Sequence, residues 1–344
     1  MGGLGRVIQV LTLAAVLGLG SPIAAANDLR TQLDIRPNNQ TAGLSRDTAD
    51  QLMRLGGNQQ AAGNYQAAIS AWTEASEIYH EIGDMAALGI AYDYIGLTYG
   101  QLGQYLEAED ALRRRLAIAR DNSDFQGQIF GWNNLGSLFI QRGDVRLAQT
   151  AFREGLTIAR SLNSYKGIGL SLSNLALGAA SRGNAQEAIK LYEAAINYRF
   201  QAGDRLGEAN TLNGLGDAYR SMARTSDAIG AYQLALRSGR ELGDRAIQLR
   251  AIDGLLAIYL NQGDVQNAPS LLNQRVALTT EQGDQWQRLK TLRLLGEYYE
   301  KVGSPELAMN FYEQALELAQ ALEDSQQVVF LNNRLLDLSS VAPL

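Results

Sequence analysis

The chain has 344 residues but no cysteine and a single histidine, His80. The absence of cysteine excludes thiol catalysis, disulfide bonds and metal sites built from thiolates. No serine or aspartate is spaced to form a catalytic triad with His80, so we expect this side chain on the surface. A phosphate-binding loop and a dinucleotide-binding fingerprint are also missing. The sequence therefore predicts a protein that is not an enzyme and holds neither a cofactor nor a metal.

A large excess of charge of one sign is missing as well. Thirty Lys and Arg residues stand against 36 Asp and Glu residues, for a net charge of -6 at pH 7. This mildly acidic balance lacks the positive field that draws proteins to nucleic acid or to anionic lipid. We therefore expect no nucleic-acid partner.

The N-terminal residues 1–26 differ in composition from the rest of the chain. Arg6 supplies a positive end, Val7–Gly20 is almost wholly apolar, and Ala24–Ala26 offers a small-residue cleavage site. This pattern predicts a secretory signal peptide and a mature protein outside the cytoplasm: in the periplasm, in a lumen or secreted. The apolar run is shorter than the roughly 20 residues of a spanning helix, so an uncleaved anchor is the alternative. Residues 27–43 are polar and predict a flexible linker.

A period of 40 residues runs from residue 44 to residue 323. One column of the period holds only alanine: Ala68, Ala108, Ala148, Ala188, Ala228, Ala268 and Ala308. Another holds mostly aspartate: Asp84, Asp124, Ser164, Asp204, Asp244, Asp284 and Asp324. Small residues at fixed offsets in such a period are typical of stacked helical repeats. The predicted units are 44–83, 84–123, 124–163, 164–203, 204–243, 244–283 and 284–323.

Each unit carries the end signals of two helices. In the fourth unit, Gly183 suits a helix end, and Asn184 with Glu187 forms a capping box that begins the next helix. Gly203 and Asp204 repeat this arrangement at the end of the unit. Two helices joined by tight turns become antiparallel neighbours. We therefore expect an all-α stack of helical hairpins, which a capping helix over 324–340 closes at the C-terminus.

Four residues of the third unit show the pattern by which the hairpins pack. Gly136 follows a leucine and precedes an aromatic, Phe139, by three residues, while Ala148 lies four residues before Phe152. This pattern resembles the tetratricopeptide repeat in a lengthened, 40-residue form, like that of exported bacterial and cyanobacterial repeat proteins. The resemblance implies a right-handed superhelical solenoid whose first helices line a concave face and bind proteins or peptides. Kinesin light chains and Rap-type peptide receptors are similar.

The resemblance also allows the residues of that concave groove to be read from the first helices. They are apolar in units two to four and charged in units five to seven, which favours a partner segment with an apolar part and an acidic part. The candidate partner-binding residues are Ile90, Asp93, Phe130, Asn133, Leu170, Asn213, Asp217, Arg250, Asp253, Lys290 and Arg293.

These residues have a plainer explanation too. The apolar ones could belong to packing between repeats, and the basic ones could pair with Glu297 and Glu300 one turn away. Arg115 and Arg275 stand in a column otherwise filled by alanine or glycine, so each should reach solvent or meet an acid. The turn at Ala223 has no glycine.

The sequence thus predicts an exported, non-enzymatic scaffold or adaptor that holds a partner protein segment in its concave groove, for assembly of an envelope or lumenal complex. The alternative is a Rap-like receptor for a short signalling peptide. Neither the partner nor the oligomeric state follows from the sequence.

Overall fold

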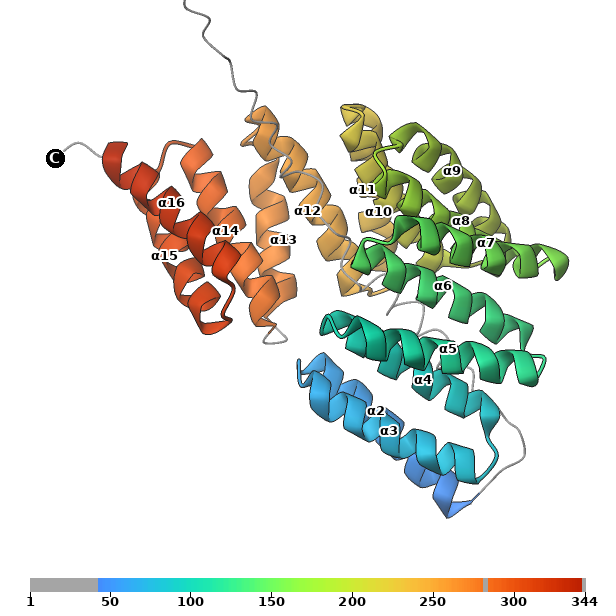
Figure 1. The fold of residues 1–344 in the computed structure, drawn as a ribbon. Coiled ribbons are helices and arrows are strands. Elements are labelled where there is room, and N and C mark those ends of the chain that lie inside the picture. The colour runs from blue at the N-terminus through green and yellow to red at the C-terminus, as the bar shows by residue number, and fades with distance from the viewer. Residues whose placement is uncertain (1–42, 281–283, 342–344) are drawn as a thin grey trace, which may run out of the picture. The chain divides into compact units, whose positions relative to one another are not determined.

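The computed structural model describes residues 43–280 and 284–341 of the chain, and within these ranges it contains fifteen α-helices and no β-strand (Figure 1). The predicted signal peptide and most of the predicted linker lie outside the described residues. The helices are α2 (Leu44–Ala61), α3 (Tyr65–Glu81), α4 (Met85–Gln101), α5 (Tyr105–Asp121), α6 (Phe125–Arg142), α7 (Val145–Ser161), α8 (Tyr165–Ser181), α9 (Ala185–Gln201), α10 (Arg205–Ser221), α11 (Thr225–Glu241), α12 (Arg245–Gln262), α13 (Ala268–Thr280), α14 (Gln285–Lys301), α15 (Pro305–Ala321) and α16 (Ser325–Val341).

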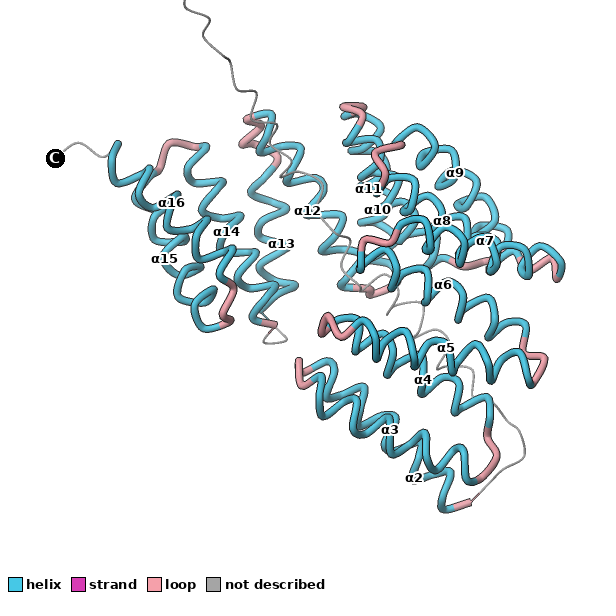
Figure 2. The backbone as a smooth tube through the Cα atoms, viewed as in Figure 1, coloured by secondary structure: helices cyan, strands magenta, loops and turns pink. Residues whose placement is uncertain are grey.

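The described residues divide into two compact units, which are considered separately. The first compact unit holds α3 to α6 and most of α2 and α7, and the second compact unit holds α9 to α16 and most of α8. These two compact units are distinct from the 40-residue repeat units of the sequence. Short loops join consecutive helices (Figure 2). Helices adjacent in sequence pack together, as α4 does with α5 and α10 with α11. We call the even-numbered helices α2 to α14 first helices and the odd-numbered ones second helices; neighbouring first helices also touch, as α10 does with α12.

Side-chain caps begin several helices at the places where the sequence predicts them. Asp124 accepts a hydrogen bond from the backbone N–H of Gly127 at 2.8 Å, and Asp244 accepts one from Ile247 at 2.8 Å. Such a bond satisfies one of the N–H groups that a helix start leaves without a partner. In the predicted capping box, Asn184 accepts from the N–H of Glu187 at 3.3 Å and its amide donates to the Glu187 carboxylate at 2.7 Å.

The residue before each of these caps adopts a left-handed backbone conformation, which suits glycine because it has no Cβ. Gly183 and Gly203 have φ values of 77° and 67°. Four residues with side chains take the same conformation, with φ between 52° and 56°: Ser123, Asn163, Ala223 and Glu323. The turn that lacks glycine in the sequence therefore has the same shape as the others, and Ala223 bears the strain.

Small residues face large ones where the two helices of a pair cross. All seven alanines of the alanine column are fully buried. A Cβ added to Gly136 would lie 2.3 Å from the Phe152 ring, and one added to Gly296 would lie 2.4 Å from the Tyr312 ring. The backbone of a first helix is thus in direct contact with an aromatic ring of its second helix, as the column pattern predicts.

Candidate interaction surface

The four candidate residues of the first compact unit are mostly buried. Asp93, Phe130 and Asn133 are buried, and only Ile90 is partly exposed. Asn133 donates to the backbone carbonyl of Ile129 at 2.8 Å. In this structure Asp93, Phe130 and Asn133 are therefore not accessible to a partner. Packing between repeats, the plainer explanation, accounts for their positions. We therefore leave these three residues out of the candidate surface.

Asp93 belongs to a buried ion pair with Arg115. The Arg115 Nε donates to Asp93 Oδ2 at 3.0 Å, and Asn134 donates to Asp93 Oδ1 at 2.9 Å. Arg115 also donates to Asp124 at 3.3 Å. Burial raises the pKa of Asp93, and the opposing effect of Arg115 and Asn134 does not cancel the rise. Arg115 thus meets acids, one of the two outcomes expected for it.

The second compact unit contains the same arrangement around Arg275. The Arg275 Nε donates to Asp253 Oδ1 at 2.7 Å, and its Nη1 donates to the backbone carbonyl of Gln287 at 3.0 Å. Lys290 lies 2.6 Å from Asp253 Oδ2. Burial alone would raise the pKa of Asp253, but Arg275 and Lys290 together hold it below its usual value. Asp253 has two cations, whereas Asp93 shares its single arginine with Asp124.

A signal for these pairs was present in the sequence but is visible only when two columns are compared. Aspartate stands in the column of Asp93 only where arginine follows 22 residues later, as in Asp93 with Arg115 and Asp253 with Arg275. The other units combine a different residue with alanine or glycine: Met53 with Ala75, Asn133 with Gly155, Ser173 with Ala195, Asn213 with Ala235 and Arg293 with Ala315. In these two columns, aspartate and its arginine partner thus occur together or not at all.

The candidate residues of the second compact unit include more exposed side chains than those of the first compact unit. Leu170 and Asn213 are buried. The remaining five lie on three neighbouring first helices, α10, α12 and α14, and we call them the charged strip: Asp217, Arg250, Asp253, Lys290 and Arg293. Lys290 is the most exposed of them, with 45% of its side chain open to solvent.

Ion pairs connect the members of the charged strip. Arg250 donates to Asp217 Oδ2 at 2.8 Å, which links α12 to α10, and the contact of Lys290 with Asp253 links α14 to α12. Arg293 lies 3.4 Å from Glu297, one of the two acids proposed in the plainer explanation. Because each base has an acid beside it, the strip offers alternating charges rather than a positive patch for an acidic partner.

Two asparagines on α10 border the charged strip and keep polar atoms without partners. The Asn213 amide donates to the backbone carbonyl of Ile247 at 3.2 Å. Its Oδ1 and the Nδ2 of Asn210 are buried and have no hydrogen-bond partner among the described residues. A buried polar group without a partner costs about 1–3 kcal/mol. These atoms have unused capacity for hydrogen bonds.

No arrangement for catalysis stands out in the described part of the chain. His80 is exposed, as expected. Residues 43–280 and 284–341 contain no cluster of His, Cys, Asp or Glu side chains that could hold a metal ion. None of the helices in these ranges is both long and apolar enough to cross a membrane.

Models of one repeat family match four stretches of the chain. They are described as tetratricopeptide repeat and match residues 47–121 and 167–241 in one form and residues 131–162 and 290–322 in another. Together these stretches cover more than half of the chain. The chain belongs to the tetratricopeptide-repeat family. Its fold is therefore one that serves as a scaffold for protein–protein interaction.

Several solved structures have a fold similar to that of this chain. The Rap conjugation gene regulator of the plasmid pLS20, in complex with the Phr* peptide, has a TM-score of 0.57 at 20% identity, over 88% of this chain and 87% of that chain. BtubC (BKLC) from P. vanneervenii has a TM-score of 0.55 at 21% identity, over 65% of this chain and 91% of that one. A Rap protein complexed with Competence and Sporulation Factor has a TM-score of 0.55 at 14% identity, over 86% and 97%. No curated protein matches the chain.

Proposed function

We propose that the protein is a non-enzymatic scaffold that binds a segment of a partner protein along the charged strip of its second compact unit. The observation that carries this proposal is the partly exposed row of polar side chains on three consecutive first helices of a tetratricopeptide-repeat array. Charged and polar groups across an interface contribute mainly to specificity and to the rate of association. The occupant is a segment with charges of both signs, because the strip alternates in sign.

The unused hydrogen-bond capacity of α10 supports a segment that presents its backbone. An extended segment carries a donor and an acceptor at each residue. A small rotation of Asn210 would place its amide against a backbone carbonyl of the partner. One buried donor that has no partner among the described residues would then gain one on binding.

The test is a cross-linking pull-down with the full chain from its source cells, followed by identification of the captured protein. We would compare the wild type with Lys290→Gln/Arg293→Gln, which neutralises two partly exposed members of the strip. Arg288→Gln, on the same helix but outside the strip, is the matched control. We expect one partner to be captured by the wild type and the control and lost from the double variant. Equal capture by all three proteins would place the interface elsewhere.

We propose further that the protein is exported and acts in assembly of an envelope or lumenal complex. The composition of residues 1–26 supports this proposal. N-terminal sequencing of the protein from fractionated cells tests it. A mature chain that begins at Asn27 in an extracytoplasmic fraction is expected, and an intact N-terminus in the cytoplasm would contradict it. An intact N-terminus in the membrane fraction would favour the anchor.

A receptor for a short signalling peptide is the second candidate function. One of the similar structures is a Rap conjugation gene regulator in complex with the Phr* peptide, and another is a Rap protein complexed with Competence and Sporulation Factor. Peptide pools that raise the Tm of the full chain would favour this function, and that rise should disappear in Lys290→Gln/Arg293→Gln. An unchanged Tm with every pool would count against it.

The finer architecture is also part of the proposal. We propose that the repeats are the lengthened, 40-residue form, as in exported bacterial repeat proteins. Seven hairpins from residue 44 to residue 323 would then form a right-handed superhelix, with α16 as the cap. The helix bounds support this division, because α2 to α15 fall two to each predicted unit. A crystal structure of the full chain would test the handedness.

A further inference from the structure

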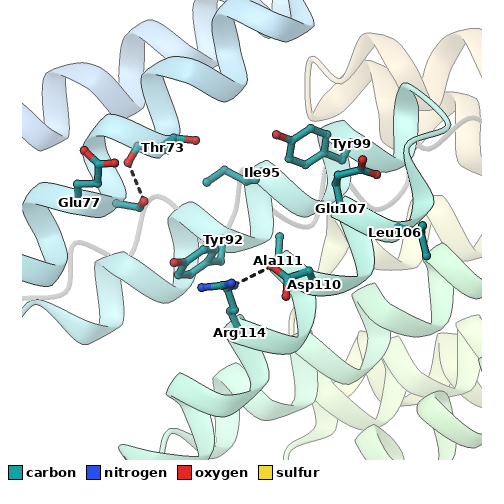
Figure 3. A pocket seen from close by; sticks show the side chains of 11 residues that line it. Thr73, Glu77, Tyr92, Ile95, Tyr99, Leu106, Glu107, Asp110, Ala111 and Arg114 are labelled. Carbon is teal, nitrogen blue, oxygen red and sulfur yellow. Dashed lines mark hydrogen bonds and ion pairs between the residues drawn. The ribbon is translucent and has the colours of Figure 1, made fainter.

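A pocket of about 520 Å³ lies in the first compact unit, and none of the predicted groove residues lines it. Second helices α3 and α5 line its two sides and the first helix α4 lies between them (Figure 3). Tyr92, Ile95 and Tyr99 of α4 supply apolar and aromatic surface. At the edge, Leu106 of α5 is 79% exposed. The volume is within the range of pockets that hold ligands in other proteins.

The pocket exists because one column of the repeat is broken at Ser76. In the six following units this column holds a larger aliphatic residue: Leu116, Leu156, Ile196, Leu236, Val276 and Leu316. In the fifth unit the equivalent Leu236 packs in a core cluster that includes Ala251. In the first repeat unit, by contrast, Ser76 lines the pocket, and its hydroxyl donates a hydrogen bond to the backbone carbonyl of Thr73 at 2.7 Å. The missing aliphatic side chain leaves room beside the aromatic surface.

The rim of the pocket carries acidic groups without partners. Glu77 on α3 and Glu107 on α5 are exposed, and within the described residues neither has a hydrogen-bond or ion-pair partner. Arg114, the one base among the lining residues, pairs with Asp110 at 2.7 Å and lies over the Tyr92 ring, 6.0 Å from its centroid. Helix α3 contains no lysine or arginine. A negative rim above an aromatic floor matches a positively charged occupant with an aliphatic stem.

We propose that this pocket binds a lysine or arginine side chain of a partner protein, next to an apolar residue of the same segment. The aliphatic stem lies on Ile95 and Tyr99, because Arg114 already lies over the Tyr92 ring, and the cation reaches Glu107. Glu77, at the opposite end of the pocket, adds its negative charge at a distance (Figure 3). The neighbouring apolar residue contacts Leu106. This site is formed mainly by second helices, so it is separate from the charged strip and does not depend on the proposed function.

The experiment uses the full chain and a fluorescein-labelled pentapeptide, Gly-Leu-Arg-Leu-Gly, titrated by fluorescence anisotropy. Ser76→Leu restores the residue of the other units and fills the pocket, and it should fold well because Leu236 beside Ala251 is the same combination as residue 76 beside Ala91. We expect Ser76→Leu to weaken binding at least about tenfold. Glu77→Gln/Glu107→Gln should weaken it about three- to tenfold. Glu74→Gln/Glu81→Gln, on α3 but outside the pocket lining, should leave it unchanged.

A second peptide with glutamine in place of arginine should bind at least about tenfold more weakly than the first. The proposal is overturned if the wild type shows no saturable binding, if the glutamine peptide binds equally well, or if Ser76→Leu retains full affinity. If the wild type binds only after residues 1–42 are removed, the occupant is the chain's own N-terminal segment and a partner segment is excluded. Reduced binding in the Glu74→Gln/Glu81→Gln control would point to general charge attraction instead of the pocket.

Discussion

At the scale of single residues, the repeat depends on a few positions where only a small side chain or an unusual backbone conformation is tolerated. The turn residue before each cap is one of these positions. Glycine adopts a left-handed conformation without strain, whereas a residue with a Cβ is strained by roughly 1–2 kcal/mol. Ala223 bears this strain with a φ of 56°. The turn is held in place by the two helices that it joins, α10 and α11.

Replacing Ala223 with glycine is therefore expected to stabilise the protein. Relief of strain outweighs the larger entropy of glycine in the unfolded chain, for a net gain of about 0.5–1 kcal/mol in the free energy of unfolding. Urea denaturation followed by circular dichroism measures it.

The matched control is the reverse change at an equivalent turn. Gly243 has a φ of 65°, and a Cβ added there would meet no atom within 4 Å. Gly243→Ala should lose about 1 kcal/mol from backbone strain alone. A loss of stability in Ala223→Gly would show that the alanine methyl makes a favourable contact that outweighs its strain.

At the scale of elements, two hairpins contain a buried Asp–Arg pair at positions where three other repeat units combine asparagine or serine with alanine or glycine. Removing one member of a buried pair leaves a charge without compensation, which costs about 3–5 kcal/mol. Replacing both members with neutral residues of suitable shape is often tolerated. The chain itself supplies the neutral combination, Asn213 with Ala235.

Arg115→Ala is expected to destabilise the protein by about 3–5 kcal/mol, because fully buried Asp93 loses its cation. Asp93→Asn/Arg115→Ala reproduces the combination of the fifth unit and should recover a large part of that loss. Chemical denaturation of the two variants and the wild type gives the comparison. If the double variant is no more stable than Arg115→Ala, the loss comes from the cavity left by the arginine and not from the isolated charge.

The pair around Asp253 predicts a pH dependence. The depressed pKa of Asp253 contributes stability that is fully present above its unfolded pKa of about 3.9 and is lost as pH falls through its folded pKa. Lys290→Met removes one of the two cations and raises the folded pKa. Since Lys290 is partly exposed, the expected loss is small, about 0.2–1 kcal/mol at pH 7.

The difference between Lys290→Met and the wild type should shrink as pH falls below about 4, because Asp253 becomes protonated in both proteins. Urea denaturation between pH 3 and pH 7 tests this. Lys190→Met on α9, an exposed lysine for which the described residues supply no carboxylate partner, is the control. A difference that stays constant over the whole pH range would show that Lys290 stabilises the fold by packing alone.

At the scale of the whole molecule, the array is built from contacts between neighbours. Within each compact unit, helices that pack together are next to each other in sequence or one helix further along, as α4 is with α5 and with α6. In such an array, stability is approximately a sum of terms for each repeat and for each neighbouring interface. A local change should therefore have a local effect.

Arg115→Ala is expected to raise amide hydrogen exchange mainly in α3 to α6, which surround the lost pair. Exchange in α12 to α15 should change little, because in a repeat array each repeat packs on its neighbours in the sequence. Hydrogen exchange followed by mass spectrometry gives the pattern by segment. A similar increase along the entire chain would show that the protein unfolds as one cooperative body.

Helix positions, turns and the contacts between small and large residues could all be predicted from the sequence. Each depends on residues close together in the chain: Asp124 caps a helix that begins beside it, and Gly136 meets Phe152 within one unit. The 40-residue period repeats these local choices and makes them visible in seven places. For such features, the sequence by itself determined the result.

The candidate surface was predicted less well, because burial depends on how neighbouring helices pack. Phe130 and Asn133 lie in columns that face a groove in the pattern, yet the structure buries both. Arg250 was predicted to attract acidic groups of a partner, yet its charge is compensated by Asp217 on another helix. The pocket beside Ser76 likewise exists only when α3, α4 and α5 are brought together. Only the tertiary structure decided which side chains remain free, since burial and charge pairing come from segments that are distant in the chain.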